Sequence, residues 1–103
     1  MKFEQAQSLG KDEARRRIEA LTDYWHNHYG VAVTWTGESA HLKGSVKGLN
    51  FDANLVVRDA SVDAQGSDPG LLLKVATTTY LKRKLGLYLD PAKTLQDLAQ
   101  AET

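Results

Sequence analysis

The spacing of apolar residues changes from the period of a helix to the period of a strand near residue 30, and later changes back. Between residues 11 and 29 the apolar positions follow one helical stripe: Ala14, Ile18, Leu21 and Trp25. Leu9 and Gly10 precede this run, with Glu13 placed to return to a Gly10 cap, and Gly30 follows it as a left-handed stop. The pattern predicts a helix over residues 11–29.

Alternation of apolar and polar residues follows and predicts strands. The alternating runs lie at residues 31–36, 40–47, 49–58 and 62–64. Because short links join them, they predict an antiparallel meander with one apolar and one polar face. Residues 2–7 can add a further strand ahead of the first helix. The apolar face is expected to be filled rather than hollow, with these inward residues: Val31, Val33, Trp35, Leu42, Val46, Phe51, Leu55, Val57 and Val62.

A second helical pattern begins after the strands. The sequence Ser-Asp-Pro at 67–69 combines an N-cap residue with a proline in the first turn, and a helical stripe continues over residues 71–88. Asp-Pro at 90–91 ends it. The chain is therefore predicted to be one α+β domain over residues 1–89, in the order strand, helix, four strands, helix. An antiparallel four- to five-stranded sheet carries two helices on one face, a reduced helix-grip-like arrangement.

Residues 90–103 are interpreted as a C-terminal tail. Thr94 and Asp97 have the spacing of a capping pair, and Leu95 and Leu98 are apolar, which predicts a short amphipathic helix that docks, frays or binds a partner. The sequence does not decide whether the tail is ordered.

Charge and composition narrow the classes of partner. The chain has 13 basic and 13 acidic residues and a formal net charge of zero, so nucleic acid or an anionic membrane would need a local patch. Cysteine is absent, which fits a reducing compartment. No apolar run approaches the ~18 residues of a membrane span. We expect a cytoplasmic protein that has no membrane span and does not bind nucleic acid.

The histidines and carboxylates that could bind a metal or act in catalysis have simpler structural interpretations. His26 and His28 are two residues apart on the predicted helix and cannot share a ligand face, so no metal or cofactor is expected. Asp52 is placed to face Lys43 or Asp63 across strands, which needs no catalysis. We therefore expect no enzymatic activity.

Two further sequence features have similarly plain interpretations. Lys47-Gly48 fits a hairpin between alternating runs, not a phosphate loop. The basic runs at residues 15–17 and 82–84 are interpreted as solvated, salt-bridged helix surfaces.

Three stretches together resemble the small polyhydroxyalkanoic acid system proteins of bacteria: LGKDEARRRIEALTDYW, YGVAVTWTGESAHLKGSVKG and YLKRKLGLYLDP. The resemblance covers residues 3–89 and rests on Leu9-Gly10, Glu13-Ala14, Arg17, Gly44, Gly48 and the apolar closing helix. This family is encoded beside polyhydroxyalkanoate granule genes. The resemblance implies an accessory role at granules and supplies no catalytic motif for this chain.

Two functions follow as hypotheses. The first is a non-enzymatic accessory protein of polyhydroxyalkanoate metabolism that binds the granule surface or a granule-associated protein through apolar residues beyond the packed stripe: Leu87, Tyr88, Leu89, Leu95 and Leu98. The alternative is a small helix-grip-like binder of an acyl or hydroxyacid ligand, held in a cavity between sheet and long helix. Self-association through a sheet edge or the tail, giving a homodimer, is a further possibility.

Overall fold

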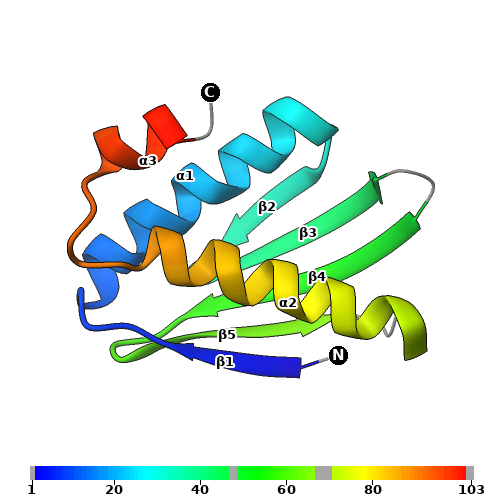
Figure 1. The fold of residues 1–103 in the computed structure, drawn as a ribbon, viewed down its shortest axis with the longest axis horizontal. Helices are drawn as coiled ribbons and strands as arrows, with labels where there is room; N and C mark the ends of the chain where they lie inside the picture. The colour runs from blue at the N-terminus through cyan, green and yellow to red at the C-terminus, as the bar shows by residue number, and fades with distance from the viewer. Residues whose placement is uncertain (1, 47–48, 67–70, 102–103) are drawn as a thin grey trace.

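The computed structural model describes the backbone of residues 2–46, 49–66 and 71–101, and the side chains of residues 2–45, 52–66 and 78–100. The chain forms an α+β domain in which two long helices lie against a twisted sheet (Figure 1). The elements in chain order are β1 (Lys2–Ala6), α1 (Lys11–Tyr29), β2 (Ala32–Thr36), β3 (Ser39–Val46), β4 (Leu49–Val57), β5 (Ser61–Gly66), α2 (Leu71–Tyr88) and α3 (Leu95–Ala101).

The sheet has five strands in the order β1-β5-β4-β3-β2, and every neighbouring pair is antiparallel. Strands β2 to β5 form the predicted meander. The first strand returns to the sheet beside the last one, with Phe3 opposite Ala64. The sequence prediction of four to five strands with two helices on one face is confirmed.

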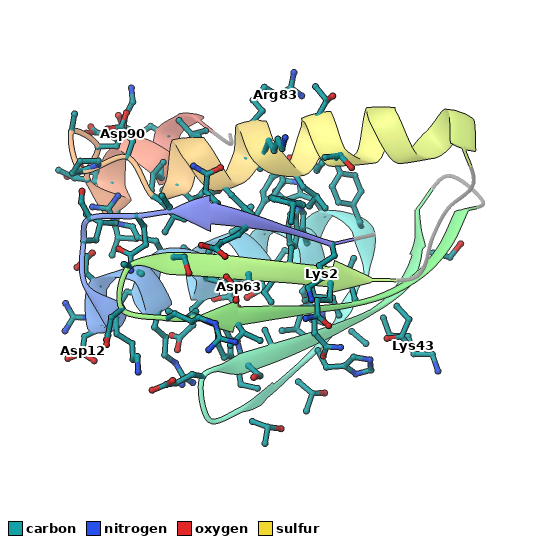
Figure 2. The ribbon with its side chains drawn as sticks, turned by 90° about the horizontal axis from the view of Figure 1, so that it is seen from below. Lys2, Asp12, Lys43, Asp63, Arg83 and Asp90 are labelled. Carbon is teal, nitrogen blue, oxygen red and sulfur yellow. The ribbon has the colours of Figure 1, made fainter. Side chains whose placement is uncertain are left out.

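The two faces of the sheet differ in cover. The helices α1 and α2 cover the apolar face, whereas Figure 2 shows the other face uncovered, with Lys2, Lys43 and Asp63 on it. The strand register explains this division, because residues that are opposite each other on neighbouring strands point to the same side. Lys43, for example, is paired with Asp52, and both side chains are exposed.

The core lies between the apolar face and the helices. Its buried members are Ala14, Ile18, Leu21, Trp25, Val31, Ala40, Leu42, Leu55, Val57, Val62, Ala64, Leu85, Tyr88, Leu89 and Leu98. Burying one large aliphatic or aromatic side chain contributes about 1.5–3 kcal/mol. Trp25 is buried as predicted, and its indole N–H donates to the hydroxyl of Tyr80 at 3.2 Å. Trp35 is inward but only half-buried.

The start of α1 differs from the prediction. Gly10 is the N-cap with a φ of 86°, but no side chain caps it, so the predicted return of Glu13 to Gly10 is wrong. The side chain of Gln7 acts instead: its Oε1 accepts hydrogen bonds from the N–H of Leu9 at 2.7 Å and of Gly10 at 3.1 Å. Glu13 is engaged by arginines. At the other end, Gly30 has the predicted left-handed conformation, with a φ of 69°.

Two predicted turns lie partly outside the described residues. Strands β3 and β4 pair up to Val46 opposite Leu49, as a hairpin requires, while Lys47 and Gly48 themselves are not described. The predicted start of the second helix at residues 67–69 is likewise outside the described part. The end of α2 at Tyr88 agrees with the prediction.

The C-terminal tail forms the short helix α3, which folds back beside α1 (Figure 1). Within the described residues, no helix is both long and apolar enough to cross a bilayer.

Candidate functional site

The five apolar residues predicted as contact residues occupy different environments. Tyr88, Leu89 and Leu98 are only 2%, 3% and 1% exposed and belong to the core. Leu87 is half-buried, and Leu95 is 39% exposed. The prediction that all five lie beyond the packed stripe is therefore wrong for three of them, because α2 continues to pack up to its end and the tail folds back. Whether any of the five binds a partner stays a prediction.

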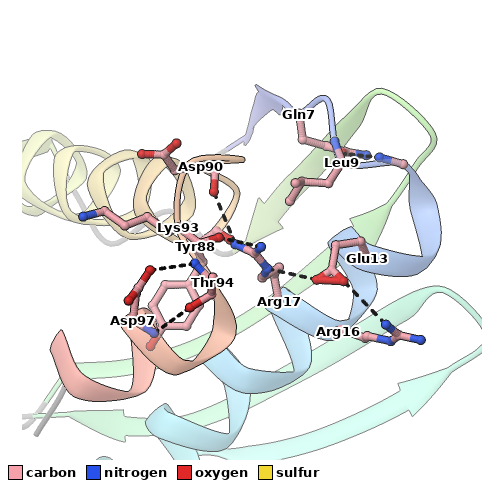
Figure 3. A network of polar contacts seen from close by, with 11 residues as sticks. Gln7, Leu9, Glu13, Arg16, Arg17, Tyr88, Asp90, Lys93, Thr94 and Asp97 are labelled. Atoms are coloured by element: carbon pink, nitrogen blue, oxygen red, sulfur yellow. Dashed lines mark hydrogen bonds and ion pairs between the residues drawn. The ribbon is translucent and has the colours of Figure 1, made fainter.

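Arg17 holds the segment between α2 and α3. This side chain is 6% exposed, and its guanidinium donates to three backbone carbonyls: Tyr88 at 3.2 Å, Asp90 at 3.3 Å and Lys93 at 2.7 Å (Figure 3). These carbonyls follow or end a helix, where backbone acceptors have no partner within the helix. One arginine of α1 therefore fixes the path of the chain after α2.

Glu13 balances the charge of Arg17. Its carboxylate lies 3.1 Å from Nε of Arg17, one helical turn away, and 3.5 Å from Nη1 of Arg16 (Figure 3). A buried charge is tolerated only when it is paired and hydrogen-bonded. The sequence contained a signal for this burial, because Arg17 is three residues after Ala14 and one before Ile18, within the buried stripe.

The helix α3 begins with the predicted capping pair. The backbone N–H of Thr94 donates to Asp97 at 3.0 Å, and the N–H of Asp97 donates to the hydroxyl of Thr94 at 3.1 Å (Figure 3). The hydrogen bond from the Thr94 backbone, and then that with its hydroxyl, lower the pKa of the Asp97 carboxyl below its ordinary value. The cap is thus formed by a charged carboxylate near neutral pH.

Leu98 anchors α3 to the core. Within the described part of α3, residues 95–100, it is the buried side chain, and the remaining ones are exposed. A helix of this length is not stable alone in water. We conclude that α3 depends on Leu98, on its cap and on the segment that Arg17 holds.

The predicted chemical groups have local structural partners. The ring of His26 contacts the carbonyl of Val31 through Nδ1 at 2.9 Å, and Nε2 of His41 lies 2.6 Å from Asp52. Asp63 pairs with Arg58 at 2.6 Å, and this hydrogen bond lowers the pKa of Asp63. Among the residues whose positions are described, no three metal-ligating side chains form a group that could hold a metal ion. The absence of enzymatic activity stays a prediction.

Two depressions lie on the surface of the described part. The first, of about 560 Å³, is at the start of α1 and is lined by Leu9, Gly10, Lys11, Asp12, Glu13, Arg16 and Asp59. Lys11 lies 3.1 Å from Glu38 and 3.8 Å from Asp59, and these partners, Glu38 first, raise its pKa. The second is on the open face of the sheet and is lined by Lys2, Asp52, Asn54, Gln65 and Gly66. Neither lies between the sheet and α2, where the ligand-binding hypothesis places a cavity.

The basic run on α1 is only partly the predicted solvated surface. Arg16 has a 69% exposed side chain and an ion pair, as predicted. Arg17 is buried, and Arg15 lies 4.4 Å from the ring centre of Trp35 while pairing with Glu19 at 2.8 Å. Arg15 also donates to the carbonyl of Gly37. The prediction of a solvated, salt-bridged surface is therefore confirmed for Arg16 and wrong for the buried Arg17.

Among the comparisons with known proteins, the one with protein-family models gives a match. A family model described as "Putative polyhydroxyalkanoic acid system protein" matches residues 1–92, which includes Arg17 and the carbonyls of Tyr88 and Asp90 that it binds. Neither the comparison with curated proteins nor that with solved structures gives a match. The family resemblance inferred from the sequence is confirmed, and the chain belongs to this family of polyhydroxyalkanoic acid system proteins.

Proposed function

We propose that this protein is a non-enzymatic accessory protein of polyhydroxyalkanoate metabolism that binds the granule surface or a granule-associated protein in the cytoplasm. The observation that carries the proposal is the family match over residues 1–92. In support of a binding role, Arg17 and His26 are engaged in structural contacts with backbone carbonyls.

The contact surface that we propose is α3. It presents Leu95 to solvent, and among the large apolar side chains of the described residues only Leu95 and Tyr29 are exposed. A short amphipathic helix can bury an apolar side chain at a hydrophobic boundary without spanning it. Leu98 is available to such a boundary only when α3 leaves the core.

Co-sedimentation with granules tests this surface. Leu95→Asp should lower the fraction of pelleted protein about tenfold or more, because burial of one leucine is worth about 1.5–3 kcal/mol and a charge at the boundary adds to the loss. Gln96→Asp is the matched control, since it introduces the same charge at an exposed position about 100° around the axis of α3 from Leu95 and should leave pelleting nearly unchanged.

Two kinds of granule separate the two binding modes. Binding to protein-free polymer particles would assign the contact to the granule surface, and binding only to native granules would assign it to a granule-associated protein. If Leu95→Asp pellets as well as the unmodified protein, α3 is not the contact. If the unmodified protein pellets with neither kind, the proposed function itself is wrong.

Substitution of Leu95 is preferable to removal of the tail. Lys93 accepts a hydrogen bond from Arg17 and Leu98 is part of the core, so a chain that ends at Leu89 loses structural contacts as well as a surface. For the same reason, replacing Leu95 and Leu98 together by Asp would disturb the core as well as the surface. Urea unfolding of each variant should accompany the sedimentation measurement.

A further inference from the structure

The second basic run lies on the outer side of the helical layer. Lys82 and Arg83 are exposed and Lys84 is half-buried, all in the C-terminal half of α2. Figure 2 shows Arg83 pointing away from the sheet. Although the chain has no net charge, a local concentration of cations can still attract an anionic partner.

The charges of Lys82 and Arg83 are not compensated by the surrounding described residues. Helix α2 contains four lysine or arginine residues and no aspartate or glutamate between residues 71 and 88. The ion pairs between described residues join Lys11, Arg15, Arg16, Arg17, His41 and Arg58 to carboxylates. Neither Lys82 nor Arg83 takes part in one of them.

Tyrosine rings from both long helices lie beneath two of these cations. The guanidinium of Arg83 is 5.8 Å from the ring centre of Tyr80, and Nζ of Lys84 is 5.1 Å from that of Tyr24 and 5.9 Å from that of Tyr80. Such contacts orient a cation without removing its charge. Tyr80 is held in turn by the indole of Trp25 at 3.2 Å, so the platform is attached to the core.

We propose that Lys82, Arg83 and Lys84, with Tyr24 and Tyr80, form a basic-aromatic surface that docks an acidic segment of a partner protein. Arginine and tyrosine are among the residue types enriched in protein interfaces, and a guanidinium binds a carboxylate through two parallel hydrogen bonds. The proposal goes beyond granule binding through α3, because it concerns a different helix and a different chemistry.

The composition of the surface favours a protein over a membrane or a nucleic acid. Within the described half of α2 no large apolar side chain is exposed, so an apolar wedge for insertion into lipid is not present there. Duplex DNA binding commonly draws on about six or more phosphate contacts, more than one cluster of three cations supplies. A short run of carboxylates matches the size of the surface.

The test uses a fluorescein-labelled peptide of ten glutamates and measures fluorescence anisotropy against the full chain. Binding should be clear at low salt and weaken at about 0.15 M salt, where exposed charges are screened beyond about 8 Å. The double variant Lys82→Gln with Arg83→Gln should weaken binding about tenfold, since each exposed ion pair contributes up to about 1 kcal/mol.

The single variant Arg83→Gln has Arg16→Gln as its matched control. Each removes one exposed positive charge, but that of Arg16 is already paired with Glu13, so Arg16→Gln should change binding less than about twofold. Absence of peptide binding by the unmodified protein would overturn the proposal, and so would an equal loss on Arg16→Gln, which would indicate unspecific charge attraction.

Vesicles of anionic phospholipid and a DNA duplex complete the experiment. If either binds more tightly than the peptide and loses binding in the α2 variant, the surface belongs to that class of partner and the acidic protein segment is the wrong occupant. Granule sedimentation of the same variant separates the two proposals, because Lys82→Gln with Arg83→Gln leaves Leu95 and α3 unchanged.

Discussion

The two basic triplets of this protein, residues 15–17 and 82–84, are alike in sequence but have different structural surroundings. Each of the three arginines at 15–17 has a different role: Arg15 covers Trp35, Arg16 forms an exposed ion pair and Arg17 is buried beneath the C-terminal segment. In the triplet at 82–84, Arg83 and Lys84 lie over tyrosine rings, and the exposed Lys82 and Arg83 form no ion pair among the described residues. Arg15 and Arg17 make contacts within the fold, whereas Lys82 and Arg83 form no ion pair among the described residues.

The difference comes from the residues one helical turn away. Consecutive helix residues point in directions about 100° apart, so the three members of each triplet meet different surroundings. The α1 triplet has Glu13 and Glu19 within four residues, and the α2 triplet has no acidic residue at that distance. Pairing with carboxylates one helical turn away compensates charges of the first set, and the sequence of α2 offers the second set no such pairing.

The largest expected effect is a difference in the free energy of unfolding between a variant of the first triplet and a variant of the second. Arg17→Ala removes a donor from the carbonyls of Tyr88, Asp90 and Lys93, of which Asp90 keeps the bond from the N–H of Lys93, and leaves Glu13 without its buried partner. We expect a loss of about 3 kcal/mol in the free energy of unfolding, measured in urea. Arg83→Ala should cost less than about 0.5 kcal/mol. Equal losses in the two variants would show that the triplets do not differ as described.

Removing the other anchor of the C-terminal segment should have the next largest effect. Leu98→Ala is expected to cost about 2 kcal/mol, at the low end for a buried leucine because α3 is short and peripheral. Leu95→Ala, on the same helix but exposed, should cost less than about 0.5 kcal/mol.

The double variant of Arg17 and Leu98 measures whether the two anchors hold one unit. If loss of Arg17 already undocks α3, the combined loss should fall short of the sum of the single losses by about 0.5 kcal/mol or more. Strict additivity would mean that α3 docks independently of Arg17.

The fold was predictable because its signals are periodic. The change from helical spacing to alternation marked α1 and the four strands of the meander, and Gly30 and the Thr94–Asp97 pair marked a helix end and a helix start. Short links between alternating runs then allow few arrangements other than an antiparallel meander. These features depend on neighbouring residues, so a sequence displays them directly.

The environment of the C-terminal residues was less predictable because it depends on a contact across about seventy positions. Arg17 binds the carbonyl of Tyr88. Every residue has a backbone carbonyl, so the sequence does not indicate which one accepts a hydrogen bond. The sequence interpretation placed the three arginines on a solvated, salt-bridged helix surface, although the position of Arg17 beside Ile18 indicates the buried stripe. Leu98 similarly belongs to the core only because the chain turns back after Asp90.

Charge reversal at one exposed position of each triplet tests the same difference between the triplets, with a smaller expected change in stability. Arg16→Glu removes the pair with Glu13 and places a carboxylate within four residues of Asp12, Glu13 and Glu19, which should cost about 1 kcal/mol. Arg83→Glu meets no acidic residue within four positions and should change stability by less than about 0.5 kcal/mol. The measurement is the urea midpoint of both variants at low salt, and similar losses would remove the basis of the comparison.

The smallest expected effect is the pH dependence of the cap that Thr94 and Asp97 form at the start of α3. Because the pKa of Asp97 is lowered in the folded protein, its charge stabilises the fold fully above the ordinary carboxyl value of about 3.9, and this contribution disappears as the pH falls through the folded pKa. Asp97→Asn has no charge to lose. Its melting temperature should therefore be below that of the unmodified protein at pH 7, with the difference shrinking from about pH 5 downward. The comparison cancels other carboxylates with lowered pKa values, such as Asp63. A difference in melting temperature that stays constant down to about pH 2.5 would show that the capping hydrogen bonds, not the charge of Asp97, stabilise α3.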